Sequence, residues 1–195
     1  MALWRFRSTE FDRVVARAIL RHASPMAERP WKLVTLVADE KILLGAAAAA
    51  WLATRALAPE RRREADHLAL SVALSTALPH LLKLLFDQER PSRTVARAKH
   101  RGIPRSGKAF DAFPSGHATH VGAMCMALSR FFPSAKATIW SVGGIVAASR
   151  VMLLAHWPTD ILAGLGTGAG TETLLWKLQG AYDGRAAGVT GGVRR

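Results

Sequence analysis

Five long apolar runs divide this 195-residue chain, and they constrain its fold more than any other feature. Each run is close to the ~20 residues that a helix needs to cross ~30 Å of hydrocarbon. Backbone polar groups inside a bilayer must be satisfied within their own segment, so such runs predict helices. We therefore expect an all-α fold, an integral membrane bundle of about five transmembrane helices in a single domain (residues 1–180), with spans near 34–58, 68–86, 116–132, 137–154 and 158–178.

The two ends of the chain have a different character. Residues 8–22 alternate charged and apolar side chains at helical spacing, and this segment is too short and too charged to cross a bilayer. It predicts an amphipathic helix lying at the membrane interface, with an ordinary soluble amphipathic helix as the alternative. Residues 181–195 contain Gly and Arg without any periodicity, which predicts a flexible tail.

The charge balance is unusual for a chain in which half of the residues are hydrophobic. Lys and Arg outnumber Asp and Glu by 27 to 14, which gives a formal net charge of +13. The cations flank the apolar runs instead of forming one stripe, and this favours a lipid bilayer as partner over nucleic acid. The basic loop 93–108 has two interpretations: it collects a polyanionic head group, or it is a solvated loop attracted to anionic lipids.

Polar side chains gather at three places, each at the end of an apolar run. Counting membrane crossings from one run to the next brings all three places to the same face. The second run ends there, the third leaves from it, and the fourth returns to it. The three clusters are Lys83 with Arg90-Pro91, Pro114-Ser115-Gly116-His117, and Ser149-Arg150 with His156 and Asp160.

These side chains suit phosphate chemistry. Arginine binds phosphate oxygens in bidentate fashion, and the backbone amides at a helix that opens with Ser115-Gly116 form an anion site. A histidine followed four residues later by a carboxylate, as in His156 and Asp160, favours a fixed imidazole tautomer with Nε2 free to attack. The alternative for this pair is simple capping of a helix start.

The motifs Lys83-x6-Arg90-Pro91, Pro114-Ser115-Gly116-His117 and Ser149-Arg150-x5-His156-x3-Asp160 resemble the three-part signature of the type 2 phosphatidic acid phosphatase family. That family shares its pocket with vanadium haloperoxidases. Eleven specified positions match in order and spacing. The short chain and the five-span layout look most similar to bacterial undecaprenyl-diphosphate phosphatases.

The resemblance implies a role for each signature residue. His156 is expected to be the nucleophile, Asp160 to orient it, and His117 to act as general acid and base. No metal ion and no other cofactor is expected. The remaining residues are expected to bind the substrate phosphate: Lys83, Arg90, Ser115, Gly116 and Arg150.

The function that this resemblance implies is hydrolysis of a lipid phosphate or diphosphate through a phosphohistidine. Undecaprenyl diphosphate, phosphatidic acid, phosphatidylglycerol phosphate and lipid A phosphates all present a phosphate beside apolar chains. Three alternatives stay open: a lipid phosphotransferase that uses the same intermediate, a soluble vanadate-binding haloperoxidase, and a non-catalytic lipid-binding membrane protein. A nucleic-acid binder is the least favoured interpretation, because a single tyrosine offers little for base stacking.

The resemblance also implies a location, a bacterial inner membrane crossed several times, with the site on the extracytoplasmic face. Counting Lys and Arg on each side by the positive-inside rule favours the cytoplasmic face, but the cations expected to bind substrate inflate the count on the active-site side.

Within the last run, glycines at Gly164, Gly166, Gly168 and Gly170 predict close helix packing. Glu172 in the same run predicts either a functional carboxylate or a partner for a neighbouring helix.

Overall fold

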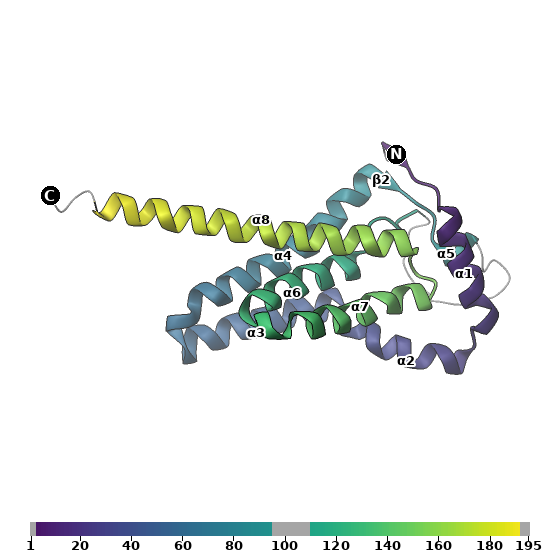
Figure 1. The fold of residues 1–195 in the computed structure, drawn as a ribbon, viewed down its shortest axis with the longest axis horizontal. Helices are drawn as coiled ribbons and strands as arrows, with labels where there is room; N and C mark the ends of the chain where they lie inside the picture. The colour runs from purple at the N-terminus through teal and green to yellow at the C-terminus, as the bar shows by residue number, and fades with distance from the viewer. Residues whose placement is uncertain (1–2, 95–109, 192–195) are drawn as a thin grey trace.

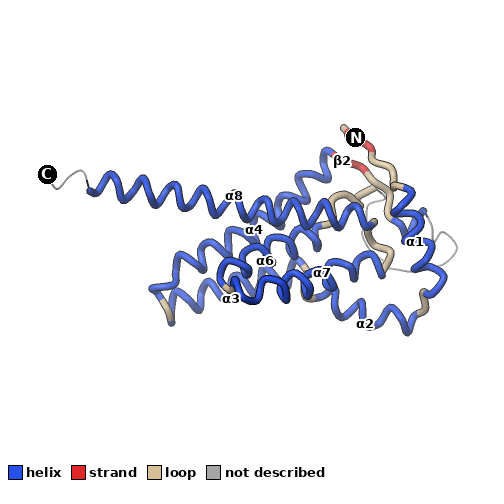
Figure 2. Tube along the Cα trace, viewed as in Figure 1, coloured by secondary structure: helices blue, strands red, loops and turns tan. Residues whose placement is uncertain are grey.

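The computed structural model describes residues 3–94 and 110–191, and most of them are helical. The long helices lie side by side along the long axis of the molecule, as Figure 1 shows. Two shorter helices, α1 and α2, lie toward one end, and Figure 2 shows two short strands at that same end. The five long helices are α3 (Glu40–Leu57), α4 (Arg62–Leu85), α6 (Gly116–Phe131), α7 (Lys136–Met152) and α8 (Pro158–Gly191).

The helices expected from the five apolar runs are confirmed, with two differences in their bounds. The first run, 34–58, is divided: α2 (Pro25–Leu36) ends within it, and α3 begins only at Glu40. The Asp39 side chain causes this break, because its Oδ1 accepts from the backbone N–H groups of Lys41 and Ile42 and so caps α3. At the other end, α8 continues to Gly191, into the segment 181–195 for which a flexible tail is expected. No proline interrupts the chain there.

Length and apolar composition identify one candidate span among the described helices, Pro59–Leu85. The other helices of the bundle do not meet the same criteria. Two of them, α6 and α7, have 16 and 17 residues, fewer than the ~20 that cross a bilayer without tilt or thinning. The mostly helical architecture is therefore established, and a count of five spans is not.

Helix α6 lies at the centre of the bundle and packs most extensively against α8. Glycines allow the two backbones to approach. A Cβ at Gly168 would collide with the Thr119 backbone carbonyl of α6, and one at Gly164 would collide with the Ser115 carbonyl. Gly166 and Gly170 face open space. The expected role of these small residues in close packing is thus confirmed for the two glycines on the α6 side.

A buried ionic cluster joins three helices away from the signature residues. The Glu172 carboxylate of α8 is fully buried and lies 3.1 Å from His67 Nε2 of α4. The Arg130 Nε of α6 donates to the same carboxylate at 3.1 Å. Glu172 therefore has the neighbouring-helix partners that were one of its two predicted roles.

The N-terminal segment lies across one end of the bundle. Strand β1 (Trp4–Arg5) pairs in parallel with β2 (Phe86–Asp87), which follows α4. Thr9 and Asp12 then form a capping box that starts α1 (Glu10–His22). The expected amphipathic helix is present, and its buried Ala16 packs in a cluster with Trp157. This contact places α1 directly against the chain that leads into α8.

Candidate active site

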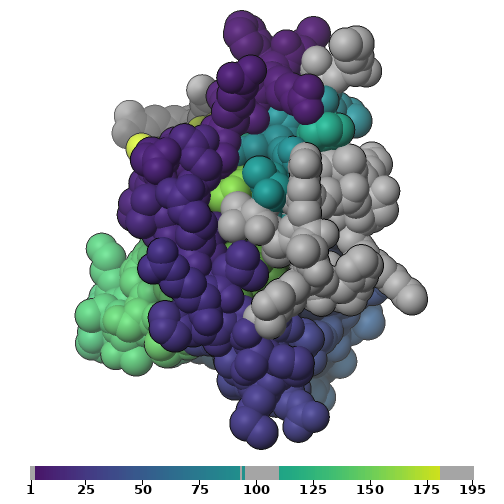
Figure 3. Space-filling view, turned by 90° about the vertical axis from the view of Figure 1, so that its right-hand side faces the viewer, coloured from purple at the N-terminus to yellow at the C-terminus, as the bar shows by residue number. Residues whose placement is uncertain are grey.

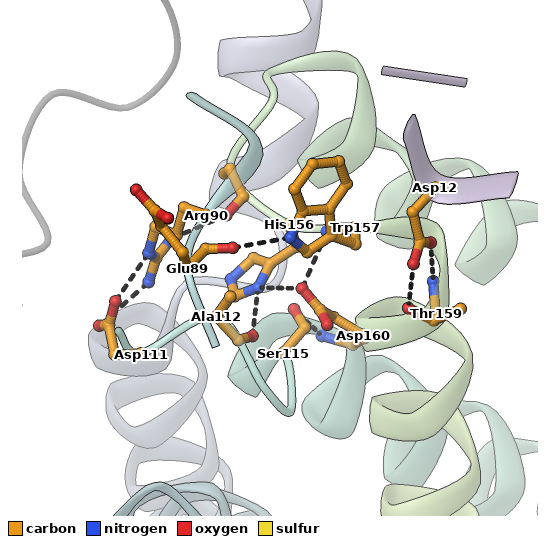
Figure 4. Close-up of polar contacts among 12 residues, drawn as sticks. Asp12, Glu89, Arg90, Asp111, Ala112, Ser115, His156, Trp157, Thr159 and Asp160 are labelled. Atoms are coloured by element: carbon orange, nitrogen blue, oxygen red, sulfur yellow. Dashed lines mark hydrogen bonds and ion pairs between the residues drawn. The ribbon is translucent and has the colours of Figure 1, made fainter. Parts of the chain in front are cut away.

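The three signature clusters meet at the end of the bundle that α1 covers. The short helix α5 (Pro91–Thr94) begins directly after Arg90, and α6 and α8 begin beside it. The Arg90 Nη1 donates to the Ala155 carbonyl at 3.0 Å, which joins the first cluster to the third. The Ser115 N–H donates to the Asp160 carbonyl at 3.3 Å, which joins the second to the third. Figure 4 shows one or more residues of each cluster close together: Arg90, Ser115, and His156 with Asp160.

His156 lies in the tight turn between α7 and α8. The Arg150 carbonyl accepts from the backbone N–H groups of Ala155 (2.9 Å) and His156 (3.2 Å), and Leu154 takes a left-handed conformation with φ of 51°. Such a conformation is costly for a leucine, so the surrounding contacts must hold this turn in place. The turn buries the imidazole almost completely, at 2% exposure.

The tautomer of His156 is set by a backbone carbonyl. Its Nδ1 lies 2.7 Å from the carbonyl oxygen of Ala112 (Figure 4). A carbonyl oxygen can only accept, so Nδ1 carries the proton and Nε2 keeps its lone pair. This arrangement is the one a nitrogen nucleophile needs.

Asp160 is close to His156 but is not its hydrogen-bond acceptor. The Asp160 Oδ2 lies 3.6 Å from His156 Nδ1 and accepts from the Trp157 N–H at 2.8 Å. The Asp160 carboxyl group therefore caps the start of α8 and lies beside the imidazole. The sequence pattern indicated the pairing with His156, whereas the Ala112 carbonyl is an acceptor that it could not reveal.

Burial and charge act on His156 together. Burial lowers the pKa of His156 well below its usual value of 6.5, and the positive charges of Arg90, Arg150 and Lys83 lower that pKa further. The hydrogen bond to Ala112 opposes this shift. The imidazole is therefore neutral, as nucleophilic attack requires.

Arg90 is held by a carboxylate that the motif does not include. Its Nε and Nη2 donate to the two carboxylate oxygens of Asp111 at 2.8 and 3.1 Å. This bidentate pair fixes the guanidinium plane against the turn that carries His156. The N–H groups that remain after this pair and the bond to the Ala155 carbonyl are available to an anion.

Arg150 and Lys83 approach the same turn from α7 and α4. Arg150 is 6% exposed, its Nη1 donates to the hydroxyl of Thr35, and its Nε has no partner among the described residues. A buried guanidinium N–H without a partner is costly, so this donor suits a bound anion. Lys83 lies in the last turn of α4, and its charge acts on the same imidazole as those of Arg90 and Arg150.

The second cluster opens α6. Ser115 is fully buried and caps the helix, its Oγ accepting from the N–H of Ala118 at 3.4 Å. The hydroxyl proton stays available to a further acceptor. Gly116 and His117 form the first turn of α6, where free backbone N–H groups favour an anion. The structure thus brings all eight predicted site residues to one end of the bundle.

A hollow opens beside this site. Figure 3 looks onto that end and shows the light-green start of α8 at the bottom of a depression, with the N-terminal segment on one side. The depression corresponds to a cavity of about 390 Å³ whose lining includes Trp157 and Glu89. Within residues 3–94 and 110–191, no group of three His, Cys, Asp or Glu side chains is arranged to hold a metal ion.

A family model agrees with this arrangement of the signature. The model described as the PAP2 superfamily matches residues 65–182, which contain all three clusters. The chain belongs to the PAP2 superfamily. The resemblance to type 2 phosphatidic acid phosphatases is thereby confirmed.

Two curated relatives are similar to part of the chain. A lipid A 1-phosphatase of Rhizobium johnstonii is 36% identical over 104 residues, which is 53% of this chain and 43% of that protein. A lipid A 1-phosphatase of Rhizobium etli is 36% identical over 103 residues, which is 52% of this chain and 44% of that protein. The chain thus matches less than half the length of these relatives.

Two solved PAP2 structures share the fold. LpxE of Aquifex aeolicus superposes with a TM-score of 0.68 at 18% identity, over 87% of this chain and 97% of that one. A transmembrane PAP2 type phosphatidylglycerolphosphate phosphatase of Bacillus subtilis superposes with a TM-score of 0.67 at 17% identity, over 87% of this chain and 85% of that one. At these identities the likeness establishes the helical arrangement alone.

Proposed function

We propose that this PAP2 protein is an integral membrane phosphatase that hydrolyses a phosphate monoester or diphosphate of a lipid through a phosphohistidine. One observation carries the proposal. The bond from His156 Nδ1 to the Ala112 carbonyl leaves the Nε2 lone pair free, among three cations that act on the same ring. A neutral imidazole surrounded by cations suits attack on a phosphate anion.

The reaction has two displacements at phosphorus. In the first, His156 Nε2 forms a bond to phosphorus as the bond to the lipid oxygen breaks, and His117 donates a proton to that oxygen. In the second, His117 accepts a proton from water as the water oxygen attacks phosphorus and Nε2 leaves. Inorganic phosphate is the product, and no metal ion takes part. Asp160, whose Oδ2 lies 3.6 Å from His156 Nδ1, orients the ring by holding the start of α8 against it.

The cations and the start of α6 stabilise the transferring group. Lys83, Arg90 and Arg150 neutralise the equatorial oxygens, and the Ser115 hydroxyl and the Gly116 N–H donate to them. The pair with Asp111 positions Arg90 for this role. Arg150 offers its Nε, a buried donor that has no partner among the described residues. Removing one donor of this kind costs about 10²–10³ in kcat.

The outer surface of the bundle supports a membrane location with about five spans. Large apolar side chains face outward on four helices, with Leu52 of α3 at 61% exposure and Leu162 of α8 at 65%. Val142 of α7 and Leu84 of α4 are exposed to a similar degree. Lipid chains would cover these side chains in a bacterial inner membrane. The site then lies at one membrane face, which we propose is the extracytoplasmic one.

Cysteine labelling in intact cells tests this orientation. Cys125 is buried, so introduced cysteines supply the signal. Met26→Cys in α2 reports the active-site end, and the exposed Glu60→Cys, in the turn between α3 and α4, reports the opposite end. We expect a membrane-impermeant maleimide to label only Met26→Cys before lysis. Labelling of only Glu60→Cys contradicts the proposed orientation.

Phosphate release from purified protein tests the activity itself. The substrate panel is undecaprenyl diphosphate, phosphatidic acid, phosphatidylglycerol phosphate and lipid A, assayed in excess chelator and again with vanadate. We expect turnover of at least one lipid that persists in chelator, is lost with vanadate, and is abolished in His156→Ala. An acid-labile phosphoenzyme should form in the wild type. An absolute metal requirement, or no hydrolysis across the panel, contradicts the proposal.

A further inference from the structure

We propose that the cavity beside the catalytic turn binds a second anionic group of the substrate head group, separate from the phosphate that His156 attacks. This inference rests on the proposed function and names its substrate class: lipids whose head group carries two phosphate groups. The cavity has a volume of about 390 Å³, and its lining includes Arg5, Arg7 and Arg13 of the N-terminal segment. Guanidinium groups bind phosphate oxygens in bidentate geometry.

The segment that carries these arginines is fixed to the site. The pairing of β1 with β2 aligns Trp4 with Phe86, and the Phe6 N–H donates to the Asp87 carbonyl at 2.9 Å. The Phe6 ring stacks on the Phe86 ring, with 5.3 Å between the ring centroids, and its centroid lies 4.9 Å from that of the Phe113 ring. These contacts join residues 4–6 to the chain that leads into Arg90 and into the Ser115 cap. The cations of this segment therefore have defined positions beside the site.

The charge in the cavity is not neutralised within the described chain. Arg13 is paired with Glu10 at 2.8 Å, so its charge is largely satisfied. The Arg5 guanidinium carbon lies over the Phe110 ring, 4.4 Å from its centroid, and this contact does not neutralise the positive charge. Neither Arg5 nor Arg7 forms an ion pair with a residue that the structure describes. Against these two cations the lining holds one carboxylate, Glu89, so a bound anion is favoured.

The wall of the cavity is continuous with the catalytic residues. Trp157 follows His156, and Glu89 precedes Arg90. The Trp157 Nε1 donates to the Glu89 carbonyl at 2.7 Å, so the indole that lines the cavity is held beside the segments that carry His156 and Arg90. In this proposal, a lipid with one phosphate at His156 places its second anionic group beside Arg5 and Arg7. A head group with a single phosphate leaves those cations without a ligand.

Arginine substitution with paired substrates tests the inference. Phosphatidic acid presents one phosphate group, whereas phosphatidylglycerol phosphate presents two and lipid A bisphosphate also presents two. We expect Arg7→Gln and Arg5→Gln to raise KM for the two-phosphate lipids about tenfold with kcat unchanged, in line with one lost charged hydrogen bond. KM for phosphatidic acid should stay within about twofold. Arg17→Gln is the matched control, because Arg17 is exposed on α1 and lies outside the cavity lining.

Equilibrium binding separates this inference from the proposed function. His156→Ala protein in detergent is titrated with phosphatidylglycerol phosphate and with phosphatidic acid, so no turnover is needed. Tighter binding of the two-phosphate lipid that disappears with Arg7→Gln supports the second anion site, even if the panel assay shows no hydrolysis. Equal losses for both lipids, or an equal effect of Arg17→Gln, overturn it and leave the proposed hydrolysis standing.

Discussion

The Asp12 carboxylate of α1 accepts hydrogen bonds from both the N–H of Thr159, at 3.1 Å, and its hydroxyl, at 2.8 Å. Thr159 lies in the first turn of α8, three residues after His156, and Asp12 is fully buried (Figure 4). Asp12 also accepts from the Thr9 N–H that begins its own helix. One carboxylate thus caps two helices and joins the N-terminal helix to the catalytic turn.

We expect Asp12→Ala to lower kcat about tenfold while KM stays within about twofold, because loss of a buried cap costs about 1 kcal/mol or more and loosens the turn. Asp12 does not contact the substrate in this proposal, so it acts as a positioning residue. Asp12→Asn keeps an oxygen that can accept and should recover most of kcat. We would measure kcat and KM for the wild type and both variants in samples that contain the same fraction of folded protein.

The control for that prediction is Glu10→Ala. Glu10 is an exposed acid on the same helix, and its ion pairs with residues that the structure describes are those with Arg13 and Arg17. Its removal should leave kcat unchanged. If Asp12→Ala lowers the melting temperature without changing kcat, or if Asp12→Asn gives no recovery, then Asp12 has a purely structural role.

The pH dependence follows from the environment of His156. Burial, then the charges of Arg90, Arg150 and Lys83, hold its pKa well below 6.5. The neutral nucleophile therefore persists as the pH falls through that value. With an aryl phosphate whose leaving group needs no proton, kcat/KM for phosphoenzyme formation in His117→Gln should stay flat from about pH 8 to about pH 5.5. A decline centred near 6.5 would show that the imidazole titrates normally.

Much of this arrangement could be predicted from the sequence, because its signals are local. Helix length follows from apolar run length, and the spacing from His156 to Asp160 is one helical turn. The Ala112 carbonyl and Asp111 act through contacts that only the folded chain creates. Asp12 lies 147 positions from Thr159 along the sequence, so no spacing rule connects them. The amphipathic pattern predicted α1 itself but not the surface against which it packs.

The buried ionic cluster of Glu172, His67 and Arg130 predicts a stability effect without a catalytic one. Glu172→Ala leaves the buried His67 and the partly exposed Arg130 without this carboxylate, which costs about 1–3 kcal/mol. We expect a clear loss in melting temperature in detergent, with kcat of the remaining folded protein preserved. The control is Glu64→Gln, which removes an exposed pair with Arg61 at 3.9 Å and should change little. A large loss of kcat in folded Glu172→Ala would instead indicate a catalytic link.

Two glycines of α8 offer a matched pair for the contact between α6 and α8. A Cβ at Gly168 would collide with the Thr119 carbonyl and the Ala123 nitrogen, which are backbone atoms that cannot turn aside, whereas one at Gly166 meets nothing within 4 Å. Gly168→Ala should therefore destabilise the fold by about 1–3 kcal/mol, since α6 and α8 must separate. Gly166→Ala should hold or raise stability, because alanine costs less entropy in a helix. Thermal unfolding of both variants decides the point, and equal melting temperatures would mean that α6 and α8 do not pack this closely. Since α6 and α8 begin at the Ser115 cap and the catalytic turn, activity should fall together with stability in Gly168→Ala alone.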